Sequence, residues 1–413
     1  MNEKTLRILE FNKIIEKLVS HTASNLGSQL AEQLMPENDI EKVKISLKET
    51  SDGVNFISRR GSPPLGGIHD IRDSVRRADL GSMLNPAELI KIADVLRAVR
   101  NLKNYSSSDN IKEEDNIVGE LINCLETSKK VEDKINQCIV SEEEISDNAS
   151  PLLGNIRRQI RHAQNSIKNK LNDLIRSPKY QKYIQESIVT MRGERYVIPV
   201  KQEYRAEIPG LIHDSSASGA TLFIEPMAVV EANNAIRELK LKEQAEIERI
   251  LRELSGDVAE ISAALNSNIT LLAKLDFIFA KAKLSLDLNC VCPKLNNEGK
   301  IVIKKGRHPL LDAKTVVPID FWIGEEFDTL VITGPNTGGK TVTLKTVGLF
   351  TLMTQAGLHI PANEGTEVSV FNKVFADIGD EQSIEQSLST FSSHMKNIVN
   401  ILESLDDSSL VLF

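Results

Sequence analysis

The stretch from Leu330 to Thr351 restricts the possible folds of this chain more than any other. An apolar run leads into a glycine-rich segment, GPNTGGKT, and apolar residues at helical spacing follow. This order predicts a strand over Thr329–Thr333, a loop and a helix, and the loop fits the phosphate-binding pattern G-x-x-x-x-G-K-[ST]. The predicted nucleotide site consists of Gly334, Pro335, Asn336, Thr337, Gly338, Gly339, Lys340 and Thr341.

Each residue type in this loop has a physical role. The glycines let successive backbone N–H groups point at one phosphate, and the following helix adds its positive N-terminal end. Lys340 supplies a positive charge for the β and γ phosphates, so we predict that it is catalytic. The Thr341 hydroxyl is the predicted metal ligand. The loop therefore predicts ATP and Mg²⁺ as cofactors.

Composition narrows the remaining classes of protein. A chain of 413 residues with 41% apolar content is long enough for several cores. The formal net charge of −8 argues against a uniformly basic coat for nucleic acid. No apolar run nears the roughly 20 residues that span a bilayer, and Met1–Glu10 lacks the apolar core of a signal peptide. We therefore expect a cytoplasmic protein with no membrane partner.

Helical patterns dominate the first part of the chain, and we expect a helical core domain over residues 1–149. Asn85-Pro86-Ala87-Glu88 predicts a helix start, because Asn caps, Pro fits the first turn and Glu reaches back. The helix should extend from 86 to about 103. Arg59–Gly67 is dense in turn residues; it either turns the chain between helices or presents its arginines to a phosphate.

Two long helical patterns enclose a β segment in residues 150–286. Ser150-Pro151 opens the first of them, and apolar residues recur at gaps of three or four from Leu153 to Leu174 and again from Ile247 to Leu286. Between them, RYVIPV and TLFIEP are strand-like runs separated by turn compositions. The pattern predicts long antiparallel helices that pair like a coiled coil, with a small β insertion at about 188–226.

The first of these helices and the β segment are basic. From Arg157 to Arg205, twelve Arg and Lys residues stand against four acidic ones, a net charge of +8. This surface either follows nucleic-acid phosphates or is an ordinary solvated face. The nearby loop His213–Ala220 contains Ser, His and Asp, but a catalytic triad needs residues that converge from separate segments. We therefore expect a contact loop at this end of the helices.

From residue 287 the pattern becomes α/β, and strands are predicted near Lys300–Lys304 and Thr315–Phe321. His308 either lies near the nucleotide or has a structural role in its turn. The serine-rich segment Ser387–Ser393 offers hydroxyl and N–H groups to an anion, or simply caps a helix. The sequence ends in an apolar strand, LVLF, before the acidic residues that normally hold Mg²⁺. We thus expect the N-terminal part of an ATPase domain over 287–413.

Several segments, taken together, resemble the MutS ATPases: GPNTGGKT, GRHPLL, the Ser389-Thr390-Phe391 segment and the closing LVLF. RGSPPLGGIHDIR, GERYVIPVKQEYRAEIPGLIHDSSASGATLFIEP and DIGDEQSIEQSLSTFSSHM resemble the type-two branch in particular. The resemblance covers essentially the whole chain. It implies a multidomain α and α/β fold: a helical core, lever helices with a small β insertion, and a P-loop ATPase domain of the ABC type. It also implies a homodimer in which Ser389 faces the partner's γ phosphate, which makes Ser389 the second predicted catalytic residue.

The same resemblance implies a function. The type-two branch is associated with binding branched DNA to suppress homologous recombination, and with splitting collided ribosomes in ribosome rescue. We therefore expect an ATP-dependent clamp on branched DNA or on ribosomal RNA, with ATPase and endonuclease activity in the intact protein. An ABC ATPase of the chromosome-structuring type is disfavoured, because its P-loop would lie near the N-terminus.

This sequence departs from the family pattern at its end, where the Walker B acids, the His switch after them and the small nuclease domain called Smr are absent. The alternative is therefore a non-hydrolysing dimerisation fragment that only binds nucleotide. Turnover by these 413 residues would require another carboxylate, such as Asp377 or Glu381.

Overall fold

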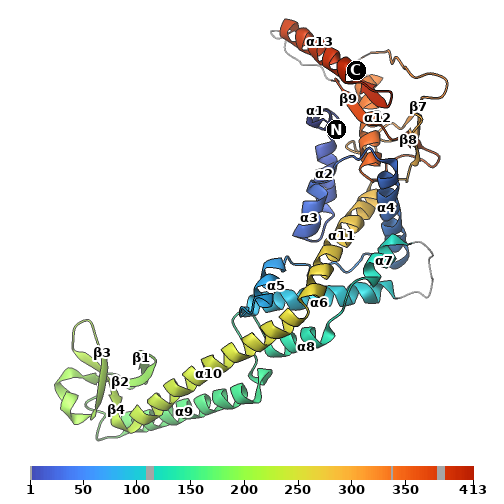
Figure 1. The fold of residues 1–413 in the computed structure, drawn as a ribbon. Coiled ribbons are helices and arrows are strands. Elements are labelled where there is room, and N and C mark those ends of the chain that lie inside the picture. The colour runs from blue at the N-terminus through green and yellow to red at the C-terminus, as the bar shows by residue number, and fades with distance from the viewer. Residues whose placement is uncertain (1, 108–115, 336–337, 379–386) are drawn as a thin grey trace. The chain divides into compact units, whose positions relative to one another are not determined.

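The computed structural model describes residues 2–107, 116–335, 338–378 and 387–413 and shows a mixed helical and α/β architecture (Figure 1). The helices are α1 (Glu3–Ile8), α2 (Phe11–Ser20), α3 (Asn25–Glu32), α4 (Ile40–Arg60), α5 (Arg72–Asp79), α6 (Pro86–Ser106), α7 (Ile117–Asn123), α8 (Lys129–Cys138), η1 (Asp147–Ala149), α9 (Pro151–Arg176), η2 (Gln202–Glu207), α10 (Met227–Glu260), α11 (Ser262–Asp287), α12 (Lys340–Gln355) and α13 (Ser387–Ser404). The strands are β1 (Thr190–Arg192), β2 (Arg195–Lys201), β3 (Gly210–Ser215), β4 (Thr221–Pro226), β5 (Lys294–Asn296), β6 (Ile301–Gly306), β7 (Ile319–Ile323), β8 (Glu367–Ser369), β9 (Lys373–Ala376) and β10 (Ser409–Leu412).

The first of two compact units combines three separate stretches of chain: Met1–Arg72, Asp94–Lys129 and Ala263–Phe413. Its apolar core joins α1 and α2 to α11, α12 and the strands that flank α12. Leu9 and Phe350, more than 300 residues apart in sequence, are both fully buried in this core. The N-terminal helices and the helix after the P-loop are thus packed into one body.

Two small sheets complete the first unit. One has the strand order β5-β8-β6-β7, with β5 parallel to β8 and β6 antiparallel to β7. The other is the parallel pair β9 and β10, in which Ser409 lies opposite Lys373 and Leu412 opposite Ala376. The closing apolar run of the sequence is therefore a strand, as predicted.

The second unit comprises Asp73–Ala93 and Lys130–Ser262. Its helices α9 and α10 lie side by side and run antiparallel, because Ser150 at the start of α9 contacts Glu246 late in α10. At the other end, Leu171 of α9 and Val229 of α10 share one apolar core with the sheet. That sheet is antiparallel, with the order β1-β2-β4-β3, and lies where α9 ends and α10 begins (Figure 1).

Local signals placed several elements correctly. Helix α6 begins at Pro86, and its capping box forms as predicted: the Asn85 N–H donates to Glu88 Oε2 at 3.0 Å, and the Glu88 N–H donates to Asn85 Oδ1 at 2.9 Å. Helix α9 starts after Ser150, whose hydroxyl accepts the Leu153 N–H at 3.0 Å. Strands β2 and β4 coincide with the RYVIPV and TLFIEP runs.

The predicted strand Thr329–Thr333 is wrong, since these described residues belong to no strand. Leu330 is 43% exposed and Val331 is 78% exposed. A strand exists only with a hydrogen-bonded neighbour, and β9 and β10 pair with each other instead. The apolar run favours an extended chain but does not itself supply that neighbour.

Two other boundaries differ from the predictions. The strand expected over Thr315–Phe321 starts only at Ile319, because Asp312 organises a turn before it and accepts the Val316 N–H at 2.9 Å. The helical stretch expected up to residue 286 divides at Ile261, whose backbone angles (φ −109°, ψ 16°) leave the helical region. The division falls one residue before Ser262, the last residue of the second unit.

The predicted division into 1–149, 150–286 and 287–413 remains a prediction, while the two units interleave these ranges. None of the helices in the described part of the chain has the length and apolar character that crossing a membrane requires.

Candidate functional site

The loop before α12 has the backbone conformation that its glycines predict. Gly339 caps α12 in the left-handed region (φ 77°), and Gly334 has φ 147°. A Cβ atom added at either position would meet no described atom within 4 Å. Glycine is therefore required at these two positions by conformation and not by crowding from the described atoms.

Lys340, the first residue of α12, folds back over this loop. Its Nζ donates a hydrogen bond to the Gly334 carbonyl at 2.5 Å, so residues at the two ends of the motif are brought together. Thr341 follows in the first turn of the helix and is exposed. Asn336 and Thr337 of the predicted site lie outside the described residues. The loop can therefore offer one ammonium group, one hydroxyl and the unpaired N–H groups of a helix start to an anion.

Burial changes sharply along α12. In its first turn Thr341 and Val342 are exposed and Lys340 and Thr343 are half-buried, whereas Thr346–Gln355 is buried. The Gln355 side chain anchors the far end: its Nε2 donates to the carbonyls of Glu37 at 2.7 Å and Phe371 at 2.9 Å. The helix thus turns its positive N-terminal end to the loop while its C-terminal end is fixed in the core of the first unit.

An ion cluster ties α12 to the junction of α1 and α2. Glu10, in the left-handed region (φ 58°), accepts from Lys345 Nζ at 3.0 Å and from Lys13 Nζ at 2.5 Å. Its hydrogen bond from Lys13 holds the pKa of the Glu10 carboxyl below its usual value, and Lys345 adds to this effect. Sequence reasoning missed this contact because 335 residues separate Glu10 from Lys345.

His308 is buried in the turn that follows β6. Its Nδ1 accepts the Leu310 N–H at 3.3 Å, and burial lowers the pKa of its imidazole. These contacts give His308 a structural place in the turn, and a role toward nucleotide stays a prediction.

The structure gives the side-chain contacts of Asp377 but not those of the other two candidates, Ser389 and Glu381. Asp377 directly follows β9, and its N–H donates to the Leu412 carbonyl at 2.9 Å, at the carboxyl edge of the parallel pair. Its carboxylate lies 3.9 Å from Lys4 Nζ and accepts from Asn397 Nδ2 at 3.3 Å. Ser389 lies on the first turn of α13, with a side chain outside the description, and Glu381 lies outside the described residues.

A buried polar network, which sequence reasoning missed, connects α4 and α11. Lys281 is fully buried and donates to the Ser46 carbonyl at 3.3 Å and to its hydroxyl at 3.1 Å. Glu49 lies 3.6 Å from Lys281 Nζ and 2.8 Å from Lys274 Nζ. Burial lowers the pKa of Lys281 to about 8. The one available sequence signal was a lysine among apolar residues, between Phe279 and Ala282.

The same network reaches the chain just after α12. Thr50 donates to the Gly357 carbonyl at 2.6 Å. The two ring nitrogens of His359 lie 2.8 Å from the Ser285 hydroxyl and 3.0 Å from the Ser51 hydroxyl. Burial lowers the pKa of His359 to about 4, so its ring is neutral at pH 7. Hydrogen bonds therefore join α4, α11 and the end of α12 within the first unit.

The second unit carries the basic segment, and part of its charge is neutralised. Arg157 pairs with Glu243 at 2.6 Å, and Arg195 pairs with the fully buried Glu225 at 2.8 Å. Among the described residues, no carboxylate lies within ion-pair distance of eight other cations. We call these eight the basic surface: Arg158, Lys168, Lys170, Arg176, Lys179, Lys182, Lys201 and Arg205.

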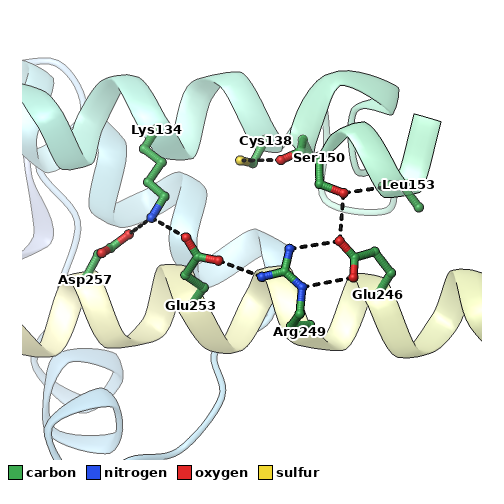
Figure 2. A network of polar contacts seen from close by, with 9 residues as sticks. Lys134, Cys138, Ser150, Leu153, Glu246, Arg249, Glu253 and Asp257 are labelled. Atoms are coloured by element: carbon green, nitrogen blue, oxygen red, sulfur yellow. Dashed lines mark hydrogen bonds and ion pairs between the residues drawn. The ribbon is translucent and has the colours of Figure 1, made fainter. Parts of the chain in front are cut away.

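A ladder of ion pairs braces the other end of this helix pair, and Figure 2 shows it along α10. Lys134 of α8 bonds to Glu253 at 2.8 Å and to Asp257 at 2.6 Å. Arg249 bridges Glu253 and Glu246 at 2.9 and 2.8 Å. Glu246 in turn accepts the hydroxyl of Ser150, the residue that caps α9, at 2.7 Å. Alternating charges thus hold α8, α9 and α10 together.

The residues of the His213–Ala220 segment have separate partners. His213 Nε2 lies 2.5 Å from Glu225 Oε2, and Asp214 pairs with Arg192 at 3.2 Å. Glu225 also accepts from Asn233 Nδ2 at 2.7 Å. This arrangement satisfies a buried carboxylate.

Comparison with known proteins gives the family. The model of MutS domain V matches residues 330–413, which include the P-loop and α12. Endonuclease MutS2 of Acetivibrio thermocellus is 75% identical over 414 residues. The proteins of the same name from Ruminiclostridium cellulolyticum and Clostridioides difficile are 65% identical over 412 residues and 56% identical over 414 residues. Each alignment covers 100% of this chain and 52% of the relative, so the chain spans about half the length of the curated relatives that it matches. With this identity along its whole length, the chain belongs to the MutS2 branch of the MutS family.

Proposed function

We propose that this chain binds ATP with Mg²⁺ at Gly334–Thr341 and uses the nucleotide to control its hold on nucleic acid. The Lys340 ammonium would leave the Gly334 carbonyl to pair with the β and γ phosphates, and the Thr341 hydroxyl would bind Mg²⁺. One observation carries the proposal: Lys340 and the first turn of α12 converge on a loop whose Gly334 and Gly339 have φ values that favour glycine and open space beside them.

The buried network supports a route from the nucleotide to the rest of the chain. The chain just after α12 bonds to α4 through Thr50 and to α11 through Ser285. Helix α11 follows α10 with only Ile261 between them. We propose that α10 and α9 act as levers, since a movement of α12 would act on α11 through packed and hydrogen-bonded contacts.

The proposed target is nucleic acid held by the basic surface. Branched DNA and the RNA of a collided ribosome both present closely spaced phosphates, which the eight cations of the basic surface can contact. We also propose a homodimer, in which Ser389 acts on the nucleotide of the partner. The relatives are named endonucleases, and we propose that a protein of their full length shares this activity.

The P-loop assignment is tested with Lys340→Ala and, as a matched control, Lys314→Ala on an exposed loop. Losing a charged hydrogen bond to phosphate should weaken ATP binding about 10- to 100-fold in the first variant and leave the control unchanged. Equal affinity in both variants would refute the assignment. Calorimetric binding and phosphate release are measured on the same protein, so binding without turnover identifies the alternative, an interaction module that only holds nucleotide.

A competition experiment distinguishes the two proposed targets, branched DNA and ribosomal RNA. A labelled four-way DNA junction is bound first, and ribosomes or unlabelled junction are added as competitors. Release by ribosomes at lower concentration than by junction would identify ribosomal RNA as the preferred target, and the reverse order would identify branched DNA.

A further inference from the structure

The tyrosines of this chain are unevenly distributed. Four of its five tyrosines lie in a short stretch of the second unit: Tyr180, Tyr183, Tyr196 and Tyr204. Tyr196 is buried at 6% exposure, whereas the other three are only partly covered. The half-buried tyrosines therefore place aromatic rings at the protein surface, at the end of α9 and in η2.

The protein backbone fixes this group of rings. After α9, the chain turns and joins the edge of β2: Ile184 forms a bridge with Val200, and the Lys201 N–H donates to the Tyr183 carbonyl at 3.0 Å. The rings of Tyr183 and Tyr204 lie with their centroids 5.0 Å apart at an interplanar angle of 44°. The two rings are thus held as a pair before any ligand arrives.

A lysine ammonium lies over each of two of these rings. The ammonium of Lys179 lies 5.0 Å from the centroid of the Tyr180 ring, and that of Lys182 lies 4.8 Å from the centroid of the Tyr183 ring. Tyr180 and Tyr183 pack against the apolar core of this unit, while both lysines over their rings are exposed. The surrounding charges belong to the basic surface defined above.

We propose that Tyr180, Tyr183 and Tyr204 form a stacking platform for the unpaired bases of single-stranded nucleic acid, with Lys179, Lys182 and Lys201 contacting the adjoining phosphates. This inference rests on the proposed function and specifies the part of the target that the basic surface grips. An aromatic ring offers a π face to any base, while a lysine next to it attracts the backbone.

Duplex nucleic acid should bind this stacking platform less well than a single strand. In a duplex, the faces of the bases are stacked on one another, so rings on a protein surface cannot reach them without unstacking. Unpaired bases occur where strands exchange in branched DNA and in the loops of structured RNA, and their faces are free. The platform therefore selects unpaired segments of either polymer, whereas the remaining basic surface binds phosphates of any form.

The test compares Tyr183→Leu and Tyr204→Leu, which remove the π face and keep apolar bulk, with the matched variants Tyr183→Phe and Tyr204→Phe. The probes are labelled oligothymidylate and oligouridylate of about 20 nucleotides, and a duplex of the same length. Fluorescence anisotropy gives the affinities, and circular dichroism with thermal unfolding checks that each variant is folded. Photocrosslinking with 5-iodouracil oligonucleotides then maps which residues contact a base.

Each Leu variant should bind the single strands about tenfold more weakly while duplex affinity stays the same, and the Phe variants should match the wild type. Crosslinks should map to Tyr180, Tyr183 or Tyr204. The salt dependence of binding should fall in Lys182→Gln but not in Tyr183→Leu. Wild-type affinity in the Leu variants, or equal losses for single strand and duplex, would overturn the platform while the proposed nucleic-acid function stands. If the wild type binds none of the three probes, both proposals fail.

Discussion

Replacing the buried Lys281 by methionine should change how stability depends on pH. Lys281 is 1% exposed, and its ammonium bonds to Ser46 and lies 3.6 Å from Glu49. Methionine fills a similar volume without a charge. Glu49 keeps a partner in the variant, because Lys274 Nζ lies 2.8 Å from its carboxylate. The substitution therefore removes a buried charge without leaving its carboxylate alone.

The magnitude follows from the pKa of Lys281, which burial lowers from 10.5 to about 8. Because one pKa unit corresponds to about 1.4 kcal/mol, the charged form costs about 3 kcal/mol at pH 7. The folded pKa is below the unfolded one, so the unfolded chain binds more protons between pH 8 and 10.5 and wild-type stability rises over that window. Lys281→Met lacks this rise. Its lost hydrogen bonds to Ser46 cost about 1–2 kcal/mol at every pH.

We therefore expect Lys281→Met to be as stable as the wild type, or up to about 2 kcal/mol more stable, at pH 7 and less stable near pH 10. The difference between the two proteins should shift by about 3 kcal/mol across this range. Urea unfolding at both pH values measures it, and the half-exposed Lys274→Met serves as the control. Parallel stability curves for Lys281→Met and the wild type would refute the assignment of a destabilised buried charge.

Substitutions of three other side chains, Ser150, Glu225 and His359, should also change stability. Ser150→Ala removes the N-cap of α9 (Figure 2), so the second unit should lose about 1–2 kcal/mol in urea unfolding. Glu225→Ala leaves the Arg195 guanidinium without its carboxylate and should cost about 3–5 kcal/mol, whereas Glu225→Gln should cost less; hydrogen exchange of the sheet reports both. Burial lowers the pKa of His359 to about 4, so as the pH falls this imidazole takes up its proton in the unfolded chain before it does so in the folded one. The first unit should lose up to about 3 kcal/mol from pH 6.5 to 4, and this loss should be absent in His359→Gln.

Much of the fold was predictable because its signals are local. The Asn85 and Glu88 capping box, the Ser150 cap and the turn glycine Gly339 each act within a few residues of their own position. Apolar spacing gave the buried faces of α9 and α10 for the same reason. The phosphate loop is one continuous stretch, so its residues can be named from the sequence alone, and their binding of nucleotide stays a prediction.

What the sequence did not predict depends on distant parts of the chain. Whether Thr329–Thr333 is a strand depends on a hydrogen-bonded neighbouring strand, and no pattern within that segment shows whether one is present. The contact of Glu10 with Lys345 and the burial of Lys281 join residues that are hundreds of positions apart. Such residues meet only when the chain packs. Their ion pairs and pKa shifts therefore follow from the folded structure and not from the local sequence.

Control of nucleic-acid binding by the P-loop is tested most directly by the affinity for nucleic acid with and without ATP, measured for the wild type and for Lys340→Ala. ATP and Mg²⁺ should change the affinity of the wild type for a branched DNA or ribosomal RNA probe by at least about fivefold. Lys340→Ala should bind the probe with the same affinity whether or not ATP is present. An equal ATP effect in the variant, or none in the wild type, would contradict a P-loop that controls the hold on nucleic acid.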